Sequence, residues 1–201
     1  MSTRKSRFRH FDVSLAAMDN INTLLVAFMF ITILTLGIAG VLAELAEVVR
    51  NVERKQRDKL LIGWALLLLF AYFSLFWHTA DITLLEEWDF GLFLFAETGP
   101  VLLLFATQIM LGALGAEHEG EQDSSVRQSR FFVIFALLQV WSIAAGFVLG
   151  AGLTMDTAID AIVLLTCLVL ASSTSRPLHV AGLTVVWIAY VTGAVLETWV
   201  H

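Results

Sequence analysis

An ionisable residue, Glu97, lies inside one of the most apolar stretches of the chain, residues 90–116. It comes seven residues after the start of that stretch, which corresponds to about 10 Å along a helix. A carboxyl group is expensive to bury at such a depth in a membrane, and intramembrane acids commonly bind ions or relay protons. The residue type and its position therefore point to an intramembrane cation or proton site.

The three residues after Glu97 strengthen this prediction. Thr98 is followed by Gly99, which weakens a helix, and by Pro100, which has no amide hydrogen to donate to the carbonyl four residues earlier. This pair predicts a kink or a locally unwound turn, which would free carbonyl groups beside the carboxyl. Carbonyls and a carboxylate at a break in a membrane helix can hold a cation. The predicted site is therefore residues 97–100.

A purely structural interpretation of the same residues stays open. A kinked helix can carry a carboxyl that only hydrogen-bonds to a neighbouring helix. Thr79, Thr83 and Gln139 are polar residues in or beside other apolar stretches and could be its partners. In that case Glu97 would hold helices together and bind no ion.

A second group of polar residues lies near the ends of the apolar stretches. In any alternating six-span arrangement these residues share one face of the membrane, and the group comprises His78, Asp81, Asp156, Asp160 and Glu197. A mouth lined by carboxylates attracts cations. The alternative is that polar loops simply need polar residues, and Asp156 could cap the helix that it begins.

Several kinds of chemistry are excluded by what the chain lacks. No lysine lies in an apolar stretch, so a retinal Schiff base cannot form, and His78 and His179 fall near opposite faces, which disfavours bis-histidine haem. Nucleotide-binding glycine loops, nucleophile elbows and zinc-protease motifs are missing. We therefore expect no enzyme, no catalytic residue, no resident metal, no cofactor and no nucleic-acid partner.

The elements that must position these residues are six apolar stretches, at 21–43, 60–80, 90–116, 131–153, 157–173 and 178–200. About 20 apolar residues in a helix cross a hydrocarbon core of about 30 Å. Unpaired backbone groups are not tolerated in lipid, and the stretches are continuous rather than alternating, so helices are predicted and a barrel is not. The chain is predicted to be all-α and polytopic, with a basic tail at 1–20 and a bundle of six transmembrane helices at 21–201.

The basic residues alternate along the connections. Eight of the twelve lysines and arginines follow the first, third and fifth stretches, and four lie in the tail. Counting positive charges favours an N-terminus outside the cytoplasm, although the tail argues the other way. The tail itself could be a solvated coil or could lie along the lipid headgroups.

A stripe of small residues, Ser142, Gly146 and Gly150, recurs every fourth position in the fourth stretch. Such a stripe lets another helix approach closely. The partner helix can belong to the same chain, to a second copy or to a different membrane subunit.

The part of the chain from residue 61 to residue 132 carries a pattern of aromatic and glycine-proline pairs, namely Gly63-Trp64, Phe73 to Trp77, Glu87-Trp88, Phe90 to Phe95, Gly99-Pro100 and Arg130-Phe131-Phe132. This pattern resembles a widespread group of uncharacterised bacterial integral membrane proteins of similar length. The resemblance implies a multi-pass protein of the bacterial inner membrane. It implies no activity and no site.

From these features we expect a small membrane channel or transporter for a cation or proton, oligomeric, with Glu97 as its intramembrane site. Two rivals stay open at this point. One is a non-catalytic membrane subunit of a larger complex, and the other is a substrate-binding membrane component.

Overall fold

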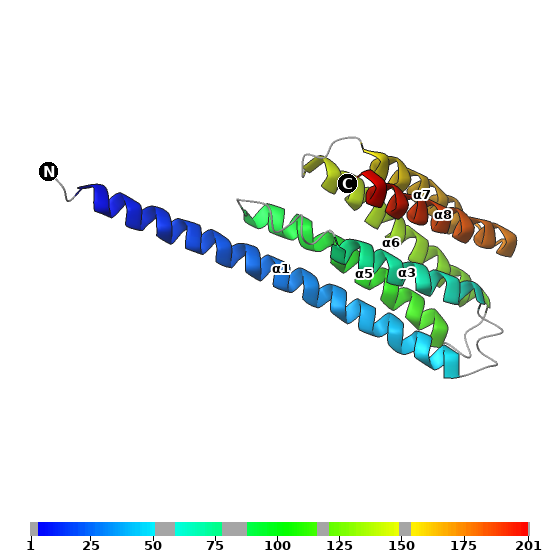
Figure 1. Cartoon of the computed structure of the whole chain (residues 1–201). Helices are drawn as coiled ribbons and strands as arrows, with labels where there is room; N and C mark the ends of the chain where they lie inside the picture. Colours follow the sequence, from blue (N-terminus) through cyan, green and yellow to red (C-terminus); the bar gives the residue numbers. More distant parts are fainter. Residues whose placement is uncertain (1–3, 51–58, 78–87, 116–120, 149–153, 201) are drawn as a thin grey trace.

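Figure 1 shows a computed structural model of the chain. The structure describes the backbone of residues 4–50, 59–77, 88–115, 121–148 and 154–200, and the side chains of 23–50, 59–77, 88–112, 126, 128–148 and 154–196. Within these ranges it contains six helices and no strand. The helices are α1 (Arg4–Arg50), α3 (Lys59–Trp77), α5 (Phe90–Gly115), α6 (Glu121–Val148), α7 (Met155–Ala171) and α8 (Arg176–Val200).

Five helical segments are long and apolar enough to cross a membrane: Thr23–Arg50, Lys59–Trp77, Phe90–Gly112, Gln128–Val148 and Arg176–Leu196. The sixth helix, α7, has 17 residues and is not among them. The prediction of an all-helical chain with membrane-spanning helices agrees with the described residues. The count of six spans exceeds the five that length and composition support.

The longest helix, α1, has 47 residues, about 70 Å, and extends past the ends of the other helices (Figure 1). The tail predicted at 1–20 is not a separate element within the described residues, because α1 runs without interruption from Arg4 through its apolar segment. Helix α6 likewise begins at Glu121, ten residues before the apolar stretch predicted at 131–153.

The starts of three helices follow from their local sequences. The Asp89 carboxylate accepts a hydrogen bond from the backbone N–H of Leu92 at 2.7 Å and so caps α5. Thr154 and Thr157 form a reciprocal capping box at the start of α7. Pro177 lies in the first turn of α8, where its missing amide hydrogen is not needed.

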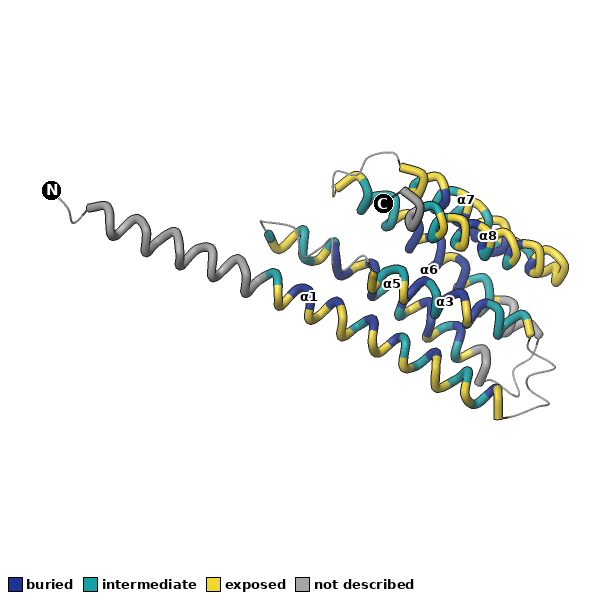
Figure 2. Tube along the Cα trace, in the orientation of Figure 1, coloured by how far each residue is buried: buried dark blue, intermediate teal, exposed yellow. Residues whose placement is uncertain are grey.

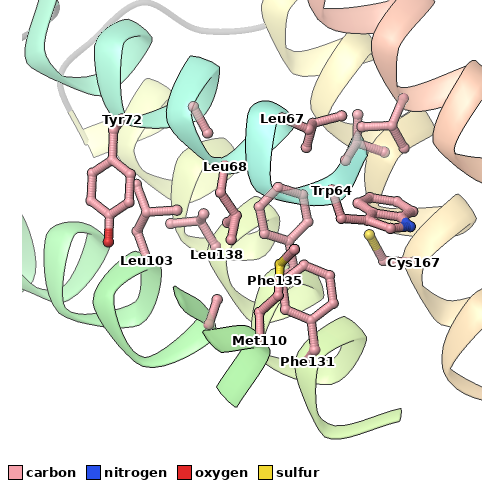
Figure 3. Close-up of a cluster of buried hydrophobic side chains, with 14 of the residues drawn as sticks. Trp64, Leu67, Leu68, Tyr72, Leu103, Met110, Phe131, Phe135, Leu138 and Cys167 are labelled. Carbon is pink, nitrogen blue, oxygen red and sulfur yellow. The ribbon is translucent and has the colours of Figure 1, made fainter. Parts of the chain in front are cut away.

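Five helices, α3 and α5 to α8, pack in a ring, and α1 lies against two of them. α1 lies against α3 and α5, α5 against α6, α6 against α7, α7 against α8, and α8 returns to α3, which also contacts α5. Figure 2 shows the buried residues on the sides of the helices that face one another. The core also extends across the ring of helices, because Trp64 of α3 makes edge contacts with the rings of Phe131 and Phe132 of α6. In Figure 3, Trp64 also lies beside Cys167 of α7.

The outward surface of the bundle is apolar as well. Within the spanning segments 22–39% of the residues in the apolar windows are buried, and many large apolar side chains, such as Leu24, Phe28 and Ile188, are exposed. Outward-facing threonines satisfy their hydroxyls within their own helix, by donating to the carbonyl four residues earlier at 2.7–3.0 Å: Thr32, Thr35, Thr98 and Thr184. A surface with this composition is suited to lipid, where no water is present to satisfy polar groups.

Among the described side chains, the basic residues lie at one end of the bundle, where Glu47 also lies and pairs with Arg50. Four exposed basic residues lie at the end where α1 stops and α3, α6 and α8 start: Arg50, Lys59, Arg130 and Arg176. At this end Ser129 donates to the carbonyl of Ala171 at 2.8 Å, which ties α6 to α7. The opposite end, where α5 and α7 begin, carries Asp89 and Asp156.

Candidate intramembrane carboxylate site

Glu97 lies in α5 between the capped start of the helix and its middle. Its side chain is 6% exposed, although the helix belongs to a segment long enough to cross a membrane. Among the described residues, neither carboxyl oxygen has a hydrogen-bond partner. A buried carboxyl without a partner is unusual, since burial of an unpaired polar group costs free energy.

The level of Glu97 in the bundle follows from one contact between α1 and α5, which run in the same direction (Figure 1). A Cβ atom on Gly40 of α1 would lie 3.4 Å from the side chain of Leu111. Glu97 is fourteen residues before Leu111, and the same number of residues before Gly40 is Val26. Val26 is apolar and buried, so at this level α1 offers an apolar side chain and no polar partner.

The three other residues of the predicted site divide between two faces of α5. Gly99 and Pro100 are buried, whereas Thr98 is exposed and its hydroxyl bonds to the carbonyl of Leu94 at 2.8 Å. The helix is continuous from Phe90 to Gly115 with Pro100 inside it, so no unwound turn is present. A local unwinding that frees several carbonyls is therefore not found at residues 97–100.

Trp141 of α6 packs against α5 at Gly99, next to Pro100. Sequence reasoning missed this contact. The indole N–H of Trp141 donates to the carbonyl of Phe95 at 2.7 Å. A Cβ atom on Gly99 would lie 2.4 Å from the indole ring, so only glycine leaves room for it. A side chain of a neighbouring helix thus bonds to the carbonyl of Phe95, one residue before Ala96, whose carbonyl Pro100 leaves without its usual amide donor. The only sequence signal was the Gly99-Pro100 pair itself.

Gln139 is not the partner of Glu97. Its amide nitrogen donates to the hydroxyl of Tyr190 in α8 at 3.1 Å, on another side of α6. The other suggested partners, Thr79 and Thr83, lie outside the described residues.

Only part of the predicted acidic mouth falls within the described side chains. Asp156 is exposed in the first turn of α7, and Asp160 is partly buried one turn later. Asp156 does not cap α7, because Thr154 does. His78 and Asp81 lie outside the described residues, as does the side chain of Glu197, although α8 includes its backbone.

Of the small-residue stripe in α6, Ser142 and Gly146 are partly buried and Gly150 lies outside the described residues. The closest helix approaches occur at other glycines. A Cβ atom would come within 2.0 Å of Tyr72 at Gly37, 2.5 Å of Leu183 at Gly63, and 2.6 Å of Leu170 at Gly182. Gly37 and Gly182 were not singled out from the sequence, and Gly63 was named there only in the Gly63-Trp64 pair of the resemblance.

Three further buried residues with polar side chains have partners. The Tyr72 and Thr107 hydroxyls hydrogen-bond at 2.9 Å between α3 and α5, and Thr107 also bonds to the carbonyl of Leu103. His179 stacks on Phe132, and its Nε2 lies 2.9 Å from the carbonyl of Ser173. Within the described part of the chain, Glu97 is therefore distinguished from Tyr72 and Thr107 by its lack of a partner.

The described side chains contain no group of three or more histidine, cysteine or acidic residues that could hold a metal ion. Chemically, the site consists of one buried carboxyl on α5, two residues after the Phe95 carbonyl that accepts a hydrogen bond from Trp141. Such a group can exchange a proton or bind a single cation.

The chain matches no protein-family model, and neither the curated proteins nor the solved structures include a match to it.

Proposed function

We propose that the protein is a small channel or transporter of the bacterial inner membrane, for a proton or another cation, with Glu97 as its intramembrane site. One observation carries the proposal: a carboxyl side chain 6% exposed, in a membrane-length helix, with both oxygens unpartnered among the described residues. Evolution keeps such an unfavourable group mainly where it has a function.

The bundle also offers the electrostatics that cation entry needs. Asp89 and Asp156 lie at the end from which Glu97 is about 10 Å away along α5, and the described basic side chains lie at the other end, together with Glu47. Negative charge at a mouth raises the local concentration of cations.

The proposal includes α7 as a sixth span. Its 17 residues reach about 26 Å, slightly less than an average hydrocarbon core of about 30 Å. A short helix packed between longer ones can be accommodated by local thinning of the bilayer. With six spans, both ends of the chain lie on the same side of the membrane.

The test is flux into proteoliposomes of the purified protein. A pH gradient and, separately, sodium and potassium gradients are applied, and the entry of each ion is followed with a trapped fluorescent indicator. We expect the native protein to conduct at least one of these ions and Glu97→Gln to lose most of that flux, since the amide cannot carry a charge or release a proton.

The matched control is Glu47→Gln, the same chemical change at an exposed acid that pairs with Arg50 at the end of α1. It should conduct as the native protein does. A folded native protein without flux would overturn the transport function, and full flux through Glu97→Gln would remove Glu97 from the path.

A second candidate function is a non-catalytic membrane subunit of a larger complex. The observation that favours it is α1, which contacts only α3 and α5 within the described residues and presents large exposed side chains such as Leu24 and Phe28. Stoichiometric copurification of a second membrane protein, lost when Leu24 and Phe28 are replaced by alanine, would support this function over the first.

A further inference from the structure

A second polar cluster lies between α6, α7 and α8, away from Glu97. It consists of Gln139, Asp160 and Tyr190. The Gln139 amide nitrogen donates to the Tyr190 hydroxyl at 3.1 Å. The helices α7 and α8 approach closely one turn after Tyr190, because a Cβ atom on Gly193 would lie 3.0 Å from the side chain of Ile159, and Asp160 directly follows Ile159. Three helices thus place an amide, a carboxylate and a phenol in one region of the bundle.

The amide of Gln139 is only half satisfied. The side chain is 2% exposed, yet its Oε1 has no hydrogen-bond partner among the described residues. Its amide nitrogen is already bonded to Tyr190, so this oxygen lies at the cluster. A buried carbonyl oxygen without a donor costs about 1–3 kcal/mol, and such groups usually meet a bound molecule that donates to them.

The chemistry of the cluster selects for positive charge and for hydrogen-bond donation. Gln139 Oε1 and the Asp160 carboxylate are acceptors, and the Tyr190 ring packs against Phe70 at a centroid distance of 5.9 Å. Aromatic faces also attract cations. A hard metal ion such as Ca²⁺ takes six or more oxygen ligands, more than an amide, one carboxylate and a phenol offer. An ammonium group, which donates several hydrogen bonds and tolerates an aromatic neighbour, fits this set better.

We propose that Gln139, Asp160 and Tyr190 form a binding site for a small ammonium-type cation, entered from the end of the bundle where α7 begins. Asp160 lies five residues from the start of α7, about 8 Å, and the exposed Asp156 lies one turn nearer to that end. The cation donates one hydrogen bond to Gln139 Oε1 and one to the Asp160 carboxylate. This binding requires no conduction and does not involve Glu97.

The chain offers a sensitive reporter for the test, because it contains two tyrosines, Tyr72 and Tyr190. Protein labelled with carbon-13 at the phenolic carbon of tyrosine gives two resonances, which Tyr72→Phe assigns. Ammonium chloride is titrated into the purified full-length protein at constant pH and constant ionic strength, with sodium chloride and tetramethylammonium chloride as the matched salts. Tyr72 serves as an internal control, since it lies between α3 and α5.

We expect the Tyr190 resonance to shift in a saturable way with ammonium and not with sodium or with tetramethylammonium, which cannot donate a hydrogen bond. The Tyr72 resonance should stay constant. Asp160→Asn should weaken the apparent affinity about tenfold or more, as expected for the loss of a charge-assisted hydrogen bond. Asp156→Asn, which removes the neighbouring exposed charge, should change it by less than a factor of about three.

Three outcomes would overturn the site. The first is a Tyr190 resonance that does not respond to ammonium, as when the Gln139 amide is turned over and presents its N–H groups. The second is an equal response to sodium, and the third is an undiminished response in Asp160→Asn. Gln139→Leu adds an independent check, because a folded Gln139→Leu protein that still binds ammonium also contradicts the proposal. Failure of ion flux would leave this equilibrium test unaffected, so the two proposals are judged separately.

Discussion

Glu97 shows how a single residue can work against the stability of the fold that contains it. Its carboxyl is buried without a hydrogen-bond partner among the described residues, whereas the hydroxyls of Tyr72 and Thr107, also buried, bond to each other at 2.9 Å. A polar group with a partner stabilises a core modestly, and one without a partner destabilises it. Replacing the polar side chain by an apolar one should therefore change the stability in opposite directions at Glu97 and at Thr107, although both are buried polar residues of α5.

Replacing Glu97 by leucine should stabilise the protein. Removal of an unpartnered buried carboxyl in favour of an apolar side chain of similar volume should raise the free energy of unfolding by about 1–3 kcal/mol. Thermal unfolding of the purified protein in one detergent measures the change. Thr107→Val is the contrasting variant, and it should lower the stability by about 1 kcal/mol, because it leaves the Tyr72 hydroxyl unpaired. A less stable Glu97→Leu protein would mean that the carboxyl has a partner outside the described residues.

At the scale of elements, the positions of the helices were largely predictable and their ends were not. Hydropathy located the apolar part of every helix, because an unbroken run of about 20 apolar residues is typical of a membrane helix and rare elsewhere. It could not detect polar helical extensions, such as residues 121–130 of α6 or the first half of α1. Those extensions lie outside the apolar segments, where composition gives no comparable signal.

The contacts between elements were harder to predict than the elements. That Trp141 donates to the carbonyl of Phe95, and that Gln139 meets Tyr190 rather than Glu97, depends on the rotation of α6 about its axis. In a membrane helix that is apolar all round, the sequence pattern does not define this rotation. The glycines Gly37 and Gly182, which permit close approach, were indistinguishable from other glycines for the same reason.

The packing of α5 against α6 gives a prediction at this scale. Gly99→Ala should lower the free energy of unfolding by about 1–3 kcal/mol, since its Cβ would fall 2.4 Å from a ring held by a hydrogen bond. Gly40→Ala is the control, because its Cβ meets Leu111 at an ordinary 3.4 Å. Adding Trp141→Phe to Gly99→Ala should recover part of the loss. Equal stabilities for the two alanine variants in thermal unfolding would contradict this account.

For the whole molecule, the charges at the two ends of the bundle favour one orientation in a membrane. Helices that follow one another along the chain alternate in direction, and Arg50, Lys59, Arg130 and Arg176 lie at one end of the bundle. The positive-inside rule assigns that end to the cytoplasm. Whether α7 crosses the membrane then decides whether the two ends of that helix meet different compartments.

Site-directed labelling can test this arrangement, because the chain has a single cysteine, Cys167, which is buried. In a Cys167→Ala background, one cysteine is introduced at Thr154 or at Thr174, on either side of α7. We expect a membrane-impermeant maleimide added to intact cells with a permeable outer membrane to label position 154 only. Position 174 should react only after the inner membrane is opened. Reaction of both positions in intact cells would show that α7 does not cross.

The uninterrupted course of α1 has an electrostatic consequence for the four basic residues between Arg4 and Arg9. The apolar stretch of α1 begins at residue 21, so a helical backbone carries Arg9 about 18 Å beyond it, and Arg4 farther. At physiological ionic strength the screening length is about 8 Å. The backbone at these residues therefore lies more than two screening lengths from the start of the apolar stretch, a distance at which interaction with lipid headgroups is weak. Their positive charge remains available to a solute or a partner that approaches through the water, well before it reaches the bilayer.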